Sequence, residues 1–333
     1  MLTCKSPRKV MRAAYRLAEQ SLPEYSCKFS RHDFTLRRLF ACLVLKEHMN
    51  CSYRRVEALL EDCESWRHDI GLERTPDHNT LCRAAKFLLQ KFRVDRMLDV
   101  QAQWASQANL LKLSSHPLAL DSTSYESHHV SRHYERRCHQ TRRRMRAKDS
   151  KKGCSRTRSD TVRRLPKLAL GVATHSHLVL SLWTGTGGGA DHPHFERALS
   201  DARRRVPNRR FTVVADAGYD SEGLHELARQ EMGLRSIIPP HSGRPRKDGQ
   251  PPGGKWRGRM ARLLRTKTSR RKCGYTRRWQ VETVNSMMKR NLGSALRGKT
   301  AWSRKRDMAL KTITHNLMIL RSRRSRQSRS GAL

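Results

Sequence analysis

Long apolar runs are missing from this sequence of 333 residues. No stretch approaches the roughly 20 consecutive apolar residues that a helix needs to cross a bilayer. The N-terminal residues also lack the apolar core of a signal peptide. These two absences argue against a membrane protein and against a secreted one, and we expect a cytoplasmic protein.

Paired cysteines are missing as well. The nine cysteines include no Cys-x-x-Cys pair, and their number is odd. Such spacing matches neither a disulfide framework nor a standard zinc site. It predicts free thiols in a reducing compartment.

Acidic side chains are scarce relative to basic ones. The chain has 70 lysines and arginines against 29 aspartates and glutamates, which leaves a formal net charge of +41. This charge exceeds what solubility requires and favours a polyanionic partner, of which nucleic acid is the expected one. Apolar residues still make up 36% of the chain, enough for the cores of two or three domains.

The few acids that are present stand at informative positions. Near the C-terminal end, spacings of three, four and seven residues separate Tyr275, Arg278, Glu282 and Lys289. At about 100° per residue, these spacings place all four side chains on one face of a helix. Glu282 is a potential metal ligand there, and Arg278 and Lys289 are potential phosphate ligands. The alternative is a solvated helix face with ordinary ion pairs.

Two upstream apolar runs each end in an aspartate. They are PLALD, which ends at Asp121, and FTVVAD, which ends at Asp216. Short apolar runs with β-branched residues predict buried strands, so both aspartates are expected at the functional edge of a sheet. Alone, either could instead cap a turn. With Glu282 they form a set of three carboxylates that suits two divalent cations about 3.5 to 4 Å apart.

These motifs resemble those of the DDE transposases of bacterial insertion sequences. In one branch of that family the third acid lies in a Tyr-x2-Arg-x3-Glu-x6-Lys signature, which residues 275–289 match at every spacing. Asp121 in LALDSTSYE matches the first-aspartate block, and Asp216 in VVADAGYDS matches the second. The resemblance extends over roughly residues 20–320 and is looser in the N-terminal part.

The resemblance implies a DNA transposase with an α/β, RNase H-like catalytic domain. Its catalytic residues and metal ligands would be Asp121, Asp216 and Glu282. Its DNA phosphate-binding residues would be Tyr275, Arg278 and Lys289. The implied cofactor is Mg²⁺ or Mn²⁺, bound as two ions. The implied partners are double-stranded DNA, as element ends and as target, and a second copy of the chain in a homodimer on DNA at the bacterial nucleoid.

Two other functions remain open at this stage. A metal-dependent, structure-specific DNA nuclease could use the same three acids without strand transfer. An inactive, domesticated relative could bind DNA through its basic charge alone. The complete set of acids favours an active enzyme, and joined DNA products would separate a transposase from a nuclease.

The expected organisation begins with a small all-helical domain over residues 1–112. Apolar three-four spacings follow Asp33 and Ser52, and a third helix is expected to begin at Asn79 or Thr80. Three short helices with arginine-rich outer faces would bind the DNA ends, mediate dimerisation, or both.

Residues 113–301 are expected to form the catalytic domain, a mixed sheet flanked by helices. The predicted elements are strands over 118–124, 168–174, 178–184, 211–216 and 234–238, helices over 193–205 and 222–232, and the helix that carries Glu282. Two basic segments interrupt this pattern, at 130–164 and at 239–274, and the composition of the second predicts an exposed insertion. Residues 302–333 are expected to form a closing helix and a basic tail that is disordered until it meets DNA.

Four further residues have milder interpretations. Asp220 and Glu126 are expected to support the site or to form turns, and Asp191 to cap a helix. Trp256, in the predicted insertion, either packs against the protein or stacks on an unpaired base.

Overall fold

The computed structural model describes residues 3–127, 165–186, 192–206, 210–241 and 253–330. The predicted basic segment 130–164 and Asp191 lie outside the described residues, as does the part of the predicted insertion over 242–252. Every predicted strand lies within them.

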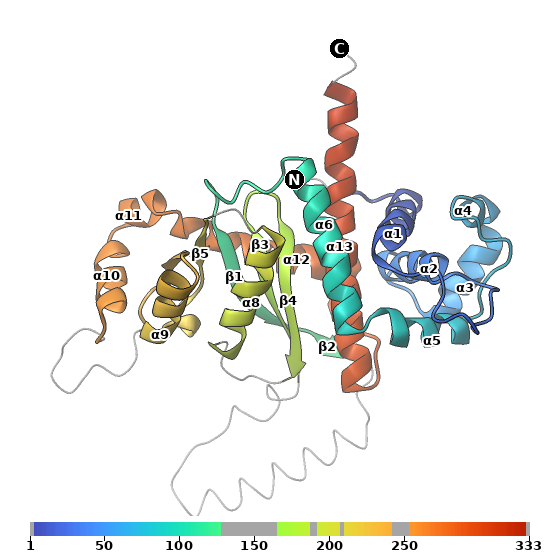
Figure 1. Ribbon diagram of the computed structural model, residues 1–333, viewed down its shortest axis with the longest axis horizontal. Coiled ribbons are helices and arrows are strands. Elements are labelled where there is room, and N and C mark those ends of the chain that lie inside the picture. The colour runs from blue at the N-terminus through green and yellow to red at the C-terminus, as the bar shows by residue number, and fades with distance from the viewer. Residues whose placement is uncertain (1–2, 128–164, 187–191, 207–209, 242–252, 331–333) are drawn as a thin grey trace, which may run out of the picture.

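The elements pass from a helical N-terminal region to a mixed α/β region (Figure 1). The helices are α1 (Pro7–Ser21), α2 (Leu36–His48), α3 (Tyr53–Asp62), α4 (Glu64–His68), α5 (His78–Leu88), α6 (Lys91–Gln107), α8 (His192–Arg205), α9 (Glu222–Glu226), α10 (Lys255–Leu263), α11 (Lys267–Lys272), α12 (Trp279–Leu292) and α13 (Ala301–Ser330). The 3₁₀ turns are η2 (Ala217–Tyr219) and η4 (Tyr275–Arg278), and η3 (Leu227–Glu231) is a π turn. The strands are β1 (Leu118–Ser124), β2 (Glu126–Ser127), β3 (Pro166–Ala173), β4 (Leu178–Thr186), β5 (Thr212–Val214), β6 (Arg235–Ile237) and β7 (Ala295–Leu296).

Helices α1 to α6 make up the described N-terminal region, where three helices were predicted. Ser52 caps α3 as predicted, because its hydroxyl accepts a backbone hydrogen bond of 3.2 Å. Thr35 rather than Asp33 caps α2. Thr35 directly precedes the first helical residue, and its hydroxyl accepts a hydrogen bond from the backbone N–H of Arg38. Asp77 caps α5, which therefore begins at His78, one residue before the predicted start.

Five of the described strands form one mixed sheet in the order β4-β3-β1-β5-β6. β4, β3 and β1 pair antiparallel, whereas β1, β5 and β6 pair parallel. Each of these strands lies within two residues of its predicted ends. The predicted class, a mixed sheet flanked by helices and preceded by a helical region, is confirmed at this level. β2 and β7 pair separately.

Alternate residues of the sheet enter two different apolar clusters. On β1, Leu118 and Leu120 enter the larger cluster, which also contains residues of α8, α13 and the N-terminal helices. Ala119 enters the second cluster together with Val281 and Val284 of α12. Figure 1 shows α13 between the sheet and helices α1 to α5, with α8 and α12 on opposite faces of the sheet. One apolar core therefore runs from α1 through α13 to one face of the sheet, and α12 covers the other face.

The closing helix is present as α13. The four apolar residues that predicted it are buried, namely Met308, Ile313, Leu317 and Leu320. The helix differs from prediction in continuing to Ser330, where a disordered tail was expected from Arg321. Arginine is a good helix former, which allows this extension. Neither α13 nor any other described helix is long and apolar enough to span a membrane.

The described part of the predicted insertion is folded, which corrects the expectation of an exposed segment. It forms α10 and α11, and two apolar side chains, Met260 and Leu264, are buried in the second cluster. These two anchors dock a basic helix beside the sheet while most of its cations stay in solvent.

Candidate active site

The two predicted aspartates lie close together, Asp121 on β1 and Asp216 two residues beyond the end of the adjacent strand β5. β1 and β5 pair parallel with Ala119 opposite Val214, each two residues before an aspartate. Ala119 and Val214 are both buried in the cluster beneath α12. Because side chains alternate along a strand, Asp121 and Asp216 also face α12.

Asp121 lies within its strand and not at the strand end. β1 continues for three residues to Ser124, and Asp121 is opposite Leu170 of β3. Burial raises the pKa of Asp121 to about 6, a backbone hydrogen bond from Ser122 opposes the shift, and the charge of Asp216 adds to it. This carboxylate is therefore poorly solvated and short of compensating positive charge.

Asp216 follows the end of β5 and begins the turn η2. Its Oδ1 accepts a hydrogen bond of 2.9 Å from the backbone N–H of Gly218. A Cβ atom at Gly218 would lie 2.9 Å from the same oxygen, so a larger residue would disturb the turn. The turn-capping interpretation of Asp216 is thus confirmed, and the cap fixes the carboxylate at the edge of the sheet.

Glu282 lies in the first turn of α12, the helix that covers the two aspartates. Val281 and Val284 are buried against the sheet. The Glu282 side chain is 54% exposed instead, and it pairs with Arg278 at 2.5 Å. The charge of Glu282 still raises the pKa of Asp121, whereas the charge of Arg278 lowers it. The three groups therefore share one electrostatic environment.

Tyr275, Arg278 and Glu282 do not share one continuous α-helix, which corrects the prediction. Tyr275 and Arg278 belong to η4, a 3₁₀ turn that leads into α12 at Trp279. A 3₁₀ turn has 3.0 residues per turn, so Tyr275 and Arg278, three residues apart, lie on one side of η4, and the α-helical spacing applies only from Trp279 onward. Burial raises the pKa of the Tyr275 phenol and the charge of Asp216 adds to the rise, so the phenol still lies near the second aspartate.

Lys289 connects α12 to β1. Its Nζ donates a hydrogen bond of 2.7 Å to Oγ1 of Thr123. Thr123 lies two residues beyond Asp121 and therefore on the same face of the strand. Nζ also lies 5.4 Å from the centre of the buried Tyr125 ring. Thr123 was not predicted, although its spacing of two from Asp121 on an expected strand was a usable signal.

The three carboxylates are not gathered into a metal-binding cluster. Within the described part of the chain, no group of three or more histidine, cysteine, aspartate or glutamate side chains is placed to hold an ion. Asp121 and Asp216 are neighbours, whereas Glu282 is paired with Arg278. As oxygen donors, all three suit a hard divalent cation. A cation beside Asp121 would supply the positive charge that this buried carboxylate lacks.

Asp220 and Trp256 serve the packing of α10. The Asp220 side chain is 1% exposed and pairs with Arg257 at 2.6 Å. The Arg229 guanidinium lies over the Trp256 ring, 4.3 Å from its centre, which favours the packing interpretation of this tryptophan. Glu126 belongs to β2, which pairs with β7 after the end of α12.

Two neighbouring carboxylates at the sheet, beside a helix that carries a third carboxylate, are groups that can serve metal-dependent chemistry on phosphodiester bonds. Comparison with known families identifies the class of enzyme. The family model described as "Transposase DDE domain" matches residues 114–317. A second model, described as "Transposase domain (DUF772)", matches residues 6–86. The first match covers more than half of the chain, which therefore belongs to the family of DDE transposases.

The protein is thus a DNA transposase, as the sequence resemblance implied. Membership of the family brings dependence on a divalent metal and DNA as the substrate. No curated protein and no solved structure matches the chain.

Proposed function

We propose that this transposase cleaves the ends of its insertion sequence and transfers the freed strands into target DNA, with Asp121, Asp216 and Glu282 as its catalytic residues. The observation that carries the proposal is the strand register. Ala119 is opposite Val214, each two residues before an aspartate, and both are buried beneath the helix that bears Glu282, which supports a shared site for the three acids. The order of strands and helices over 113–301 supports an RNase H-like catalytic domain.

The same three carboxylates would hold Mg²⁺ or Mn²⁺, as two ions. When bound, such ions activate the attacking oxygen and stabilise the leaving oxygen of the phosphodiester. The donor set fits this role because its oxygens are hard ligands and because burial leaves Asp121 in need of a cation. In the metal-free protein, Arg278 neutralises Glu282.

The phosphate oxygens next to the cleaved bond would be bound by Tyr275, Arg278 and Lys289. An ammonium group has three N–H donors, and the bond to Thr123 takes one of them. Lys289 can therefore remain attached to β1 while it donates to a phosphate. Arg278 offers five N–H donors in a planar group that matches phosphate geometry.

We assign DNA-end binding, dimerisation or both to residues 1–112, and closure of the core to residues 302–333. The N-terminal helices share one apolar core with α13 and the sheet, which supports this assignment because DNA bound to them is held in a fixed position relative to the carboxylates. Transposition brings two element ends together, which favours a homodimer on DNA. Such a protein would work in the bacterial cytoplasm, at the nucleoid.

The test combines the purified protein with Mg²⁺ or Mn²⁺, a duplex that carries the element's own end, and a target plasmid. Joined strands should form with the native protein and with Glu226→Gln, a matched change of an exposed glutamate on α9. Glu282→Gln should form neither cut nor joined strands and should keep salt-sensitive DNA binding. Normal joining by Glu282→Gln would remove this residue from the site, and nicks without joined product would indicate a nuclease.

A further inference from the structure

A cavity of about 610 Å³ lies at the edge of the sheet, away from the carboxylates. Three arginines line it, Arg229 of η3, Arg235 of β6 and Arg259 of α10. In the strand register, Arg235 lies opposite Thr212 of β5. Thr212 is four residues before Asp216. At roughly 3.3 Å per residue, the cavity lies about 13 Å along the strands from the level of the two aspartates.

The cavity opens on the same side of the sheet as the proposed active site. Ile237, two residues after Arg235 on β6, is buried in the cluster that α12 covers. Side chains alternate along a strand, so Arg235 faces the α12 side as Asp121 and Asp216 do. A single DNA segment can therefore lie against the carboxylates and the cavity together.

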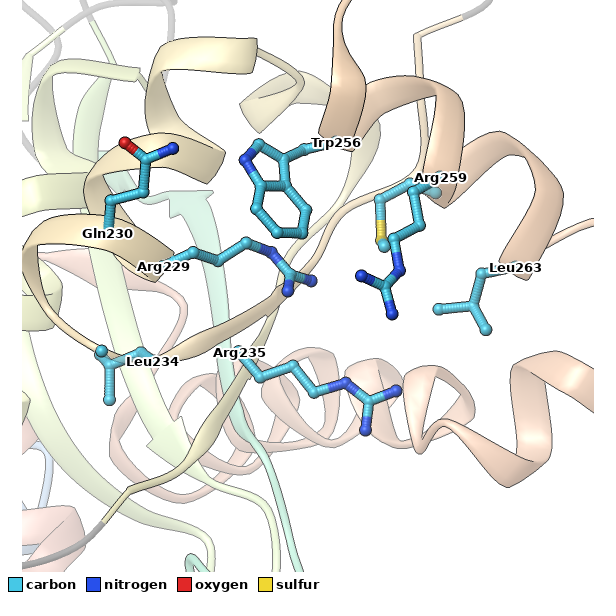
Figure 2. Close-up of a pocket in the computed structure, with 9 residues that line it drawn as sticks. Arg229, Gln230, Leu234, Arg235, Trp256, Arg259 and Leu263 are labelled. Atoms are coloured by element: carbon cyan, nitrogen blue, oxygen red, sulfur yellow. The ribbon is translucent and has the colours of Figure 1, made fainter.

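The three guanidinium groups converge in this cavity, as Figure 2 shows. No acidic side chain of the described chain lines it. Burial lowers the pKa of Arg229, and the charges of Arg259 and Arg235 lower it further, as expected of crowded cations. Like charges at close range raise the energy of the protein until an anion joins them.

The walls of the cavity are fixed before any ligand binds. Arg229 donates to Oγ of Ser236 at 3.0 Å and to its carbonyl oxygen at 2.6 Å. Arg257 of α10 is neutralised by Asp220 at 2.6 Å. Glu222 accepts the backbone N–H groups of the first turn of α10, at 2.9 and 3.0 Å. The nearby acids thus hold α10 in place and leave Arg259 to the cavity.

We propose that this cavity binds a backbone phosphate of the DNA substrate, at a distance from the bond that is cut. The inference rests on the DNA transposase function and not on the assignment of the three carboxylates. Guanidinium groups match the geometry and charge of a phosphate. At about 3.4 Å per base pair, 13 Å corresponds to about four base-pair steps. Because the Arg229 guanidinium lies over the Trp256 ring, this tryptophan helps to position one arginine of the cavity.

The test uses the full-length protein and the double variant R235Q/R259Q, which keeps the bonded Arg229. The control R262Q/R265Q removes two exposed arginines that do not line the cavity. Arg262 lies on α10 and Arg265 lies just after it. Binding to the element-end duplex is measured in EDTA over a range of salt concentrations. Because the cavity neutralises one phosphate, its loss should lower the magnitude of the slope of log K against log salt by about 1. The control should change the slope by less than half as much, and an equal change would overturn the proposal.

The position of the bound phosphate can be located with duplexes that carry one uncharged methylphosphonate linkage. One linkage, about four nucleotides from the cut, should weaken binding of the native protein about 10-fold and leave binding of R235Q/R259Q unaffected. An equal penalty in both proteins at every linkage would refute the cavity as a phosphate site. The melting temperature of R235Q/R259Q should be unchanged or higher, because repulsion is relieved. At saturating protein this variant should still cut DNA, whereas Asp121→Ala should bind without cutting, so the two proposals fail separately.

Discussion

Among single residues, the buried carboxylate of Asp121 has the clearest energetic consequence. Its pKa is raised from 3.8 to about 6, so its charged form is less favourable in the folded protein than in the unfolded chain. The folded state therefore binds the proton more tightly. The free energy of unfolding falls as the pH rises from about 4 to about 6 and stays at the lower level above that range.

We predict that Asp121→Asn stabilises the metal-free protein at neutral pH by about 1 to 2 kcal/mol, because an amide avoids the cost of burying a charge. This gain should shrink as the pH falls from 6 towards 4. Mg²⁺ should raise the melting temperature of the native protein but not that of Asp121→Asn. Thermal melts by circular dichroism measure both effects, with the exposed Asp62→Asn as the control. A variant less stable than the native protein in EDTA would contradict the prediction.

Lys289→Met should weaken binding of the element-end duplex about 10-fold and lower the salt slope by about 1, because one phosphate contact is lost. Thr123→Val should cause a smaller loss, since the ammonium group remains but is no longer fixed by its hydrogen bond. Fluorescence anisotropy at several salt concentrations provides the measurement. Lys299→Met, at an exposed lysine, is the matched control. Identical losses in the two lysine variants would show that Lys289 contributes only general positive charge to DNA binding.

The residues of the candidate site were predictable because their signals are local. Asp121 and Asp216 follow apolar runs, and Glu282 stands four residues after Arg278, a spacing that also explains their ion pair. The bond from Lys289 to Thr123 joins positions 166 apart in the sequence. Such a contact depends on how α12 packs on β1, which no local pattern specifies.

Among the elements, the strands were predicted well and the irregular helices were not. Apolar runs define the five strands of the main sheet almost to the residue. α1 was missed even though Ser6 caps it and Pro7 occupies its first turn, a usual start signal. The 3₁₀ turn η4 was missed because periodicity alone does not separate 3.0 from 3.6 residues per turn, although Gly274 marks its beginning with a φ of 82°.

The position of α8 depends on one buried cation at its end. The side chain of Arg205 has no exposed surface and pairs with Asp99 at 2.9 Å and with Asp95 at 3.3 Å, both on α6. It also donates to the carbonyl oxygen of Leu180 on β4 at 2.5 Å. These bonds join a helix that covers the sheet to both the sheet and the N-terminal region.

Arg205→Met should lower the free energy of unfolding by about 2 to 4 kcal/mol. The methionine fills much of the space, but it removes the side-chain donor of the Leu180 carbonyl group and leaves Asp95 and Asp99 with only Lys91 and Arg204 as cationic partners. Urea denaturation measures the loss. Arg203→Met, two residues earlier at an exposed position, should change stability by less than about 0.5 kcal/mol. Equal stability of the two variants would show that these bonds contribute little.

At the scale of the whole molecule, buried charges tie the N-terminal region to the catalytic region. Glu47 of α2 lies between Lys46 at 3.3 Å and Lys311 of α13 at 2.8 Å. Lys311 also donates to the carbonyl oxygen of Leu292, at the end of α12. Burial alone would raise the pKa of Glu47, but the two ammonium groups outweigh it and the pKa is lowered. Glu47 therefore stabilises the fold above pH 4.5, and this contribution is lost as the pH falls further.

Glu47→Gln should destabilise the protein by about 3 to 5 kcal/mol, because two buried ammonium groups lose their paired carboxylate and keep only the charge of Asp307 nearby. Since the core is shared, fluorescence and circular dichroism should report one unfolding transition in the native protein and in the variant. Glu61→Gln, at an exposed position on α3, is the control. Separate transitions for the two regions would contradict the shared core. The division at residue 112 stays a prediction about roles, since sequence patterns do not reveal which segments pack together.

The position of α13 also affects when the chain can fold during its synthesis. This helix follows every other described element in the sequence, yet it lies between the sheet and helices α1 to α5, and its Met318 carbonyl oxygen accepts the backbone N–H of Cys4. A chain still on the ribosome has no α13 to cover these apolar surfaces. Folding of the shared apolar core therefore requires that residues 301–330 have already been made. A chain truncated before Ala301 should therefore be insoluble. It should appear in the pellet of a cell lysate and show no DNA cleavage.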